Sequence, residues 1–199
     1  VSIYGEMGGS VVKTDRTKIW DHLIHEILHY QGFIGHGPIN GADLGIMQQQ
    51  WGASKAVTSW EAFLVGWFGK SEIVCIDSKS ISENLYVTLS SIDTFGSEPV
   101  SLMIKLSEDE LIVIEKRQNG VFTDFSKSQS FKDLNNFTAY VVNVNKASYR
   151  NDADPNAESK NFWFYLRENQ SIGLVNGVTY QGITLTPVSS NQIKITKSS

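Results

Sequence analysis

The chain has 199 residues, enough for one large domain or for two smaller ones with separate cores. A hydrophobic fraction of 41% and a charged fraction of 19% are ordinary for a folded protein and argue against an intrinsically disordered one. The net charge of −4 provides no basic field to hold a phosphate backbone, so the composition argues against nucleic acid as a partner.

The N-terminal residues carry no targeting signal that the sequence makes visible. The first ten residues lack the basic start and apolar core of a signal peptide, and no apolar run in the chain reaches the roughly 18 residues of a membrane-spanning helix. Because the chain begins at Val1 rather than at a methionine, we expect a fragment or a processed product. The single cysteine, Cys75, cannot form an internal disulfide, and its apolar surroundings predict a buried, inert thiol.

Two helices are predicted before residue 70. The helix nearer to residue 70 covers Ser59–Trp67, and Thr58 is its predicted N-cap. Glu61, three residues after Thr58, completes a capping box. A loop rich in Gly, Pro and Asn separates the two helices over residues 32–45. The first helix covers Lys18–Tyr30, and its apolar side chains recur at helical spacing, which predicts a stripe facing the core. The stripe consists of Trp20, Leu23, Ile24, Ile27 and Leu28.

After residue 70 the sequence changes to short runs rich in Val, Ile, Thr and aromatic residues, many of which alternate in polarity. Nine such runs separated by turns predict a β-sandwich. Asn176-Gly177 predicts a two-residue hairpin turn, residues 151–160 a polar loop, and Glu115-Lys116-Arg117 a solvated strand end. The predicted strands are Glu72–Ile76, Leu85–Ser91, Val100–Leu106, Glu110–Lys116, Phe137–Val144, Asn161–Arg167, Ser171–Val175, Val178–Leu185 and Gln192–Thr196.

The most informative pattern is His-Glu-Ile-Leu-His at residues 25–29 of the first predicted helix. Residues at i and i+4 lie one turn apart on the same helix face, so His25 and His29 can bind one zinc ion from the same side. Glu26 points about 100° away from His25, which suits a general base acting on a zinc-bound water better than a ligand. The alternative is a polar helix face that carries histidines by chance.

A catalytic zinc ion normally takes a third protein ligand and leaves a fourth position open for water. His36, seven residues after His29, is the predicted third ligand, and Asp43 is a more distant option. For His36 the alternative is a surface loop histidine. His22 lies on the same helix face, one turn before the motif, and we expect it at the surface or beside a ligand rather than on the metal.

The motif extends to His25-Glu26-x-x-His29-x-x-Gly32, which resembles the pattern of the metzincin metallopeptidases. Leu44-Gly45-Ile46-Met47 is similar to their Met-turn, which places a methionine beneath the zinc; ordinary core packing is the alternative for Met47. More specifically, the chain resembles the immune inhibitor A-type secreted metallopeptidases of bacteria. That resemblance also rests on residues 45–69, on Leu111–Gln118 and on Ala139–Val144.

The resemblance implies an α+β fold in which the zinc-helix portion of a metzincin-like catalytic domain precedes a β-sandwich. Residues 1–70 would be the C-terminal part of the catalytic domain and residues 71–199 the sandwich. In the family the third ligand is usually acidic, whereas here Gly35 holds the metzincin-spaced position and His36 follows it. The family also commonly carries calcium. The available acids, Asp152, Asp154 and Glu158, fit no EF-hand loop, so a plain polar loop is favoured there.

The sequence and the resemblance together predict a zinc endopeptidase that acts on protein or peptide substrates, and the resemblance alone implies that it is secreted. Zinc would polarise the scissile carbonyl and acidify its water, and Glu26 would take the proton and pass it to the leaving amine. The alternative is a non-catalytic β-sandwich that binds or adheres to a partner and carries a degenerate zinc site. The late position of His36 and the short segment before the zinc helix motivate that alternative.

Overall fold

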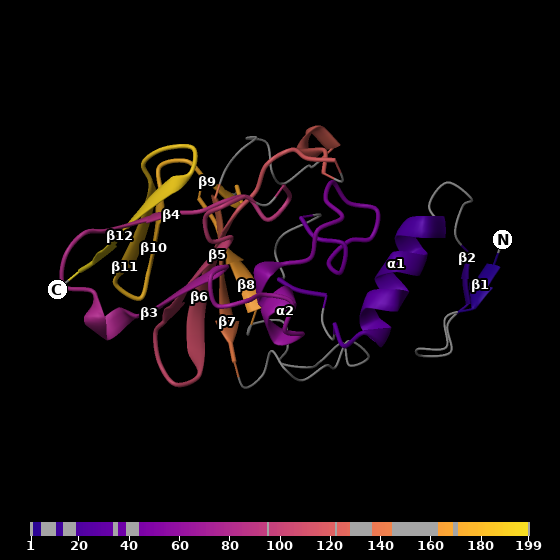
Figure 1. Ribbon diagram of the computed structural model, residues 1–199, viewed down its shortest axis with the longest axis horizontal. Helices are drawn as coiled ribbons and strands as arrows, with labels where there is room; N and C mark the ends of the chain where they lie inside the picture. Colours follow the sequence, from indigo (N-terminus) through magenta and orange to yellow (C-terminus); the bar gives the residue numbers. More distant parts are fainter. Residues whose placement is uncertain are drawn as a thin grey trace.

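The structure is a computed structural model that describes residues 2–4, 11–13, 19–33, 36–38, 44–94, 96–121, 123–127, 137–144, 163–168 and 171–198. Figure 1 shows the order of the parts along the long axis: a four-stranded sheet, a larger sheet, the helices α2 and α1, and a small hairpin. The hairpin pairs β1 (Ser2–Tyr4) with β2 (Val11–Lys13).

The larger sheet has six strands in the order β3-β5-β6-β7-β8, with β9 also paired to β7. All pairs are antiparallel except β3 with β5. In the two central strands, successive side chains are buried on opposite faces, so both faces of this sheet are covered. The strands are β3 (Ile73–Asp77), β5 (Ser101–Lys105), β6 (Glu110–Lys116), β7 (Phe137–Asn143), β8 (Trp163–Leu166) and β9 (Gly173–Leu174).

The smaller sheet is antiparallel in the order β10-β11-β12-β4, and it packs face to face on the larger one. Val87, Leu185 and Ile195 of the smaller sheet share one buried cluster with Ile112 and Ile114 of β6. This apolar layer between two sheets is the core of a β-sandwich. The strands of the smaller sheet are β4 (Leu85–Thr88), β10 (Val178–Tyr180), β11 (Ile183–Pro187) and β12 (Gln192–Lys197).

The opposite face of the larger sheet is covered by the segment that precedes it in the chain. Leu44 and Trp60 pack against Val113 and Tyr140 in a second buried cluster, together with Phe125. Short 3-10 turns lie at Ser78–Ser80 and Phe125–Lys127. Side chains from both sides of residue 70 therefore share one core, while the predicted division into domains 1–70 and 71–199 stays a prediction.

Two α-helices occur among the described residues, α1 (Ile19–Tyr30) and α2 (Ser59–Leu64). The predicted capping box of α2 is confirmed: Thr58 accepts a hydrogen bond from the backbone of Glu61, whose side chain accepts one from Thr58 N. A third buried cluster joins the two helices through Leu28, Phe33, Ile46, Met47, Val57 and Ala62. Through this cluster α1 packs against the loop that precedes α2.

The predicted α+β fold class, with the zinc-helix portion of a metzincin-like catalytic domain, is wrong. Strands hold 39% of the described residues and helices only 16%, and α1 is the one helix of substantial length. The prediction assigned the motif-bearing helix and the helix after it to the C-terminal part of a catalytic domain. The many runs of Val and Ile with a period of two decide the class instead, because they pair into two sheets.

The turn predicted at Asn176-Gly177 does not join a hairpin, because β9 before it pairs with β7 while β10 after it pairs with β11. The hairpin turn lies instead at Gln181-Gly182, where both residues have positive φ angles, 46° and 77°. This turn divides the single strand predicted over Val178–Leu185 into β10 and β11. Cys75, predicted to be buried, is exposed on the edge strand β3.

The strand end at Glu115-Lys116-Arg117 is also buried rather than solvated. Arg117 forms ion pairs with Glu115 and Asp93 at 2.6 Å and 3.2 Å, and all three side chains are 0% exposed. Glu115 in turn accepts hydrogen bonds from the backbone and hydroxyl of Ser59 at the start of α2. This pairing of opposite charges is what makes their burial tolerable, and it ties α2 to the sheet.

Candidate metal centre

His25 and His29 lie one turn apart on α1, on the face that is turned into the protein. They are 7% and 6% exposed, whereas Trp20, Ile24 and Ile27 of the predicted core stripe are all exposed. The helix is therefore rotated so that the histidine face, with Leu28, is the buried one. The prediction that the apolar stripe would face the core is wrong for those three residues.

Backbone carbonyl groups fix both imidazole rings. Nδ1 of His25 lies 2.9 Å from the oxygen of Ile46, and Nδ1 of His29 lies 2.7 Å from the oxygen of Phe33. A carbonyl oxygen only accepts hydrogen bonds, so each Nδ1 carries the hydrogen and donates it. In a neutral ring the other nitrogen, Nε2, then has no hydrogen and presents a lone pair.

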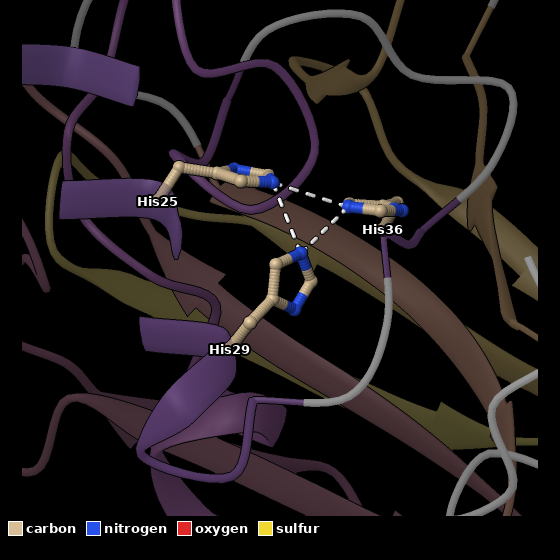
Figure 2. Close-up of side chains that lie close together, drawn as sticks. All are labelled: His25, His29 and His36. Atoms are coloured by element: carbon tan, nitrogen blue, oxygen red, sulfur yellow. Dashed lines mark hydrogen bonds between the residues drawn. The ribbon is translucent and has the colours of Figure 1, made fainter. Parts of the chain in front are cut away.

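The Nε2 atoms of His25, His29 and His36 point toward one another and form a small triangle (Figure 2). The Nε2 atom of His29 lies 3.0 Å from those of His25 and His36, which are 3.2 Å apart from each other. The rings of His25 and His36 are parallel within 7°, and the ring of His29 stands nearly perpendicular to both. Two lone pairs that face each other at 3.0 Å repel, and a cation among the three nitrogens removes that repulsion.

The six-stranded sheet supports the third histidine. Gly37, the residue after His36, lies directly against the indole ring of Trp163 on β8, where a Cβ atom would overlap the ring. Gln48 binds the same segment by donating a hydrogen bond to the carbonyl oxygen of Pro38. Glycine at position 37 thus lets the chain approach the sheet closely enough for His36 to reach His25 and His29.

The three nitrogens fit a metal ion by donor type and by spacing. Two nitrogens that each lie about 2.05 Å from a tetrahedral zinc ion are about 3.3 Å apart, close to the separations of 3.0–3.2 Å found here. Burial lowers the pKa of His25, while the hydrogen bond to Ile46 raises it. A lowered pKa keeps the ring neutral, which is the form that binds metal. The group of His25, His29 and His36 can therefore hold a metal ion.

Glu26, the predicted general base, is next to His25 on α1 but is not part of the three-histidine group. Its side chain is 28% exposed, and its charge acts on His25 by raising the pKa of that ring against the larger effect of burial. Its Oε1 atom lies 3.8 Å from Nδ1 of His22, one turn earlier on α1. His22, expected at the surface or beside a ligand, is only 2% exposed and lies outside the group.

Met47 is fully buried in the cluster beneath α1, which agrees with core packing and leaves the Met-turn role a prediction. Asp43 and Gly35 lie outside the described residues, as do the calcium candidates Asp152, Asp154 and Glu158. The sequence reasoning missed the carbonyl groups of Phe33 and Ile46, since a backbone acceptor leaves no residue-type signal. The glycine-rich loop around them was the only hint.

Comparison of the chain with protein-family models, with curated proteins and with solved structures finds no match. The resemblance to the immune inhibitor A-type metallopeptidases therefore stays a prediction, as do secretion and calcium binding. Among the described residues, no helix is long and apolar enough to cross a membrane.

Proposed function

We propose that the protein is a zinc-dependent endopeptidase in which His25, His29 and His36 hold the metal and Glu26 is the general base. The observation that carries the proposal is the convergence of three Nε2 atoms within 3.2 Å, two of them on rings whose hydrogens are committed to backbone carbonyls. A cation among the three nitrogens removes the repulsion between the lone pairs of His25 and His29, and burial disfavours a proton there because it lowers the pKa of His25.

The donor set favours zinc over other common ions. Calcium and magnesium prefer oxygen ligands, and none of the three ligand atoms is oxygen. Structural zinc sites usually have four protein ligands and include cysteine, but Cys75 is far along the chain on β3 and outside the group. Three histidines, with no fourth protein ligand in the group that the described residues form, match the pattern of a catalytic zinc site with an open position.

When bound, zinc supplies a Lewis acid that polarises a carbonyl group and makes water acidic near neutral pH. The chain supplies the rest. His25 and His29 keep their rings fixed through the carbonyl groups of Ile46 and Phe33, so the ligands need little rearrangement. Glu26 has a carboxylate that is not used as a ligand, and it accepts the proton of the attacking water. The amide C–N bond then breaks, and Glu26 returns that proton to the leaving amine.

The first experiment measures metal content by elemental mass spectrometry of the purified chain. We expect about one zinc ion per wild-type chain, and its loss in His25→Ala, His29→Ala and His36→Ala. His22→Ala is the matched control, because it removes a buried histidine of the same helix outside the group and should keep the metal. A folded wild-type chain that takes up no zinc would refute the metal site.

The second experiment tests hydrolysis with the zinc-loaded chain and an unstructured protein substrate such as casein. Glu26→Gln should keep its zinc and lose about 100-fold or more in kcat, because the amide no longer accepts a proton. Full activity in Glu26→Gln would show that another group is the base. Zinc binding without hydrolysis by the wild-type chain would contradict the peptidase proposal.

The second candidate function is a non-catalytic binding module, and one observation favours it. The sandwich has an open groove of about 780 Å³ that is lined by β4, by Val74 and Ile76 of β3, by the turn between the two strands and by Glu98-Pro99; none of the histidines lines it. Tyr86 is exposed there, and Glu83 and Glu98 lie among the lining residues. Loss of partner binding in Tyr86→Ala with unchanged zinc content would favour this function.

A further inference from the structure

We propose that His22 is a positioning residue that holds the carboxylate of Glu26 in place; the inference rests on the proposed function. His22 and Glu26 are one helical turn apart on α1, so their side chains share a face. Nδ1 of His22 lies 3.8 Å from Oε1 of Glu26 and 3.3 Å from Oε1 of Gln50. The ring thus stands between the proposed base and the loop that follows Met47.

The partners of Nδ1 determine where the ring carries its hydrogen. A carboxylate accepts and never donates, and Oε1 of Gln50 also accepts, so the ring carries a hydrogen on Nδ1 and donates it to Gln50 at 3.3 Å, on the side that faces Glu26. At 3.8 Å the contact with Glu26 is an attraction rather than a full hydrogen bond. Contacts of this kind in ligand-free active sites commonly shorten when substrate binds. The N–H group of His22 therefore draws the carboxylate of Glu26 toward one side of the helix.

The burial of His22 has a cost that its own packing does not explain. Its side chain is 2% exposed, and its Nε2 atom has no hydrogen-bond partner among the described residues. Leaving a buried polar atom unpaired costs about 1–3 kcal/mol, so an apolar residue would stabilise this helix better. The polar contacts of the imidazole are therefore at Nδ1, which donates to Gln50 and faces the carboxylate of Glu26.

The loop behind His22 is itself held to α1. Lys55 donates to the backbone carbonyl of Gln50 at 2.9 Å and forms an ion pair with Asp21 at 3.1 Å. Asp21 precedes His22 in the first turns of the helix. These contacts hold Gln50 in front of His22, and His22 in front of Glu26. A partly exposed glutamate would otherwise populate several rotamers, and a misplaced base loses much of its efficiency.

A readout independent of activity tests the contact itself. In metal-free protein labelled with 15N-histidine, Glu26→Gln should shift the Nδ1 resonance of His22, because the charged acceptor is gone. Glu83→Gln is the control, since it removes an exposed carboxylate in a groove that no histidine lines, and it should leave this resonance in place. An Nδ1 resonance that Glu26→Gln leaves in place would overturn the inference, whatever the activity of the protein.

Kinetics then test whether the contact serves the base. His22→Leu keeps an apolar side chain but no donor and should lower kcat about 10- to 100-fold with unchanged KM and zinc content. His22→Asn, whose amide can donate near the position of Nδ1, should recover most of kcat. In a Glu26→Gln background, His22→Leu should cause no further loss, because the group it positions is already absent. Equal losses in His22→Leu and His22→Asn, or additive losses in the double variant, would overturn the inference.

The two proposals fail in different ways. A wild-type chain that binds zinc and hydrolyses no substrate overturns the peptidase function, and the positioning role falls with it even if the resonance shifts. Active wild-type protein with an unmoved His22 resonance overturns the positioning role alone.

Discussion

The buried carboxyl group of Glu61 makes the stability of the protein depend on pH, and Glu61→Gln should remove that dependence. Glu61 is 3% exposed at the start of α2. Its Oε2 atom accepts hydrogen bonds from the backbone and hydroxyl of Thr58, both at 2.9 Å, while Oε1 has no partner among the described residues. Burial raises the pKa of Glu61 to about 8, against the opposing effect of the Thr58 hydrogen bonds.

The sign of the effect follows from linkage. In the unfolded chain the pKa of Glu61 is near 4.5, so between pH 4.5 and pH 8 the folded state holds a proton that the unfolded state has lost. The contribution to stability is therefore fully present below pH 4.5 and is lost as the pH rises through 8. Each pKa unit corresponds to about 1.36 kcal/mol, so this group alone lowers the free energy of unfolding by about 2–3 kcal/mol between pH 5 and pH 7.

Glutamine has no proton to lose, and its amide oxygen can accept both hydrogen bonds from Thr58. Urea unfolding of wild type and Glu61→Gln at pH 5 and pH 7, with a chelator present to exclude metal binding, gives the four free energies needed. We expect the variant to gain about 2–3 kcal/mol relative to wild type at the higher pH. Glu83→Gln, at an exposed glutamate, is the control and should show no such gain. An equal difference between wild type and Glu61→Gln at the two pH values would refute the reasoning.

Two further predictions concern the buried ion pairs and the support of the third histidine. Arg117→Met should lower the free energy of unfolding by about 3–5 kcal/mol in urea denaturation, because it leaves two buried carboxylates without their cation; an unchanged midpoint would contradict this. Gly37→Ala should weaken zinc binding about 10- to 100-fold in a chelator competition, since the new methyl group overlaps Trp163 and displaces His36. Gly69→Ala, where a methyl group meets only a flexible carboxylate, is its control.

The sequence predicts the strands well where local pattern and tertiary environment agree. β6 occupies Glu110–Lys116 as predicted, because its β-branched residues suit a central strand that is buried on both faces. The turn at Asn176-Gly177 was misread because dipeptide chemistry describes a bend and not the partner of the strand that follows. The choice between β7 and β10 as partner of β9 is made by packing between distant segments.

In the candidate site, too, the sequence predicts what depends on local spacing and misses what depends on distant residues. The i, i+4 spacing of His25 and His29 is a property of any α-helix, so the sequence is enough to place the two rings together. Which face of the helix is buried is decided elsewhere. The exposed stripe around Ile24 and the buried histidine face reflect the carbonyl of Ile46, which comes from 21 residues away, and the apolar cluster beneath it.

The third histidine shows why the motif alone led to a wrong prediction of the fold. A helix with two histidines constrains only its own turn, and any architecture that brings a third donor to the same point completes the group. Here the third donor arrives on a segment whose glycine, Gly37, rests on Trp163 of the sandwich. One face of the six-stranded sheet packs on the smaller sheet to form the sandwich core, and its other face, with Trp163, supports the segment that holds His36. The three-histidine group is consequently a property of the packed sandwich and not of a separate helical catalytic layer, so the proposed zinc binding should be measured together with stability in variants that loosen β8.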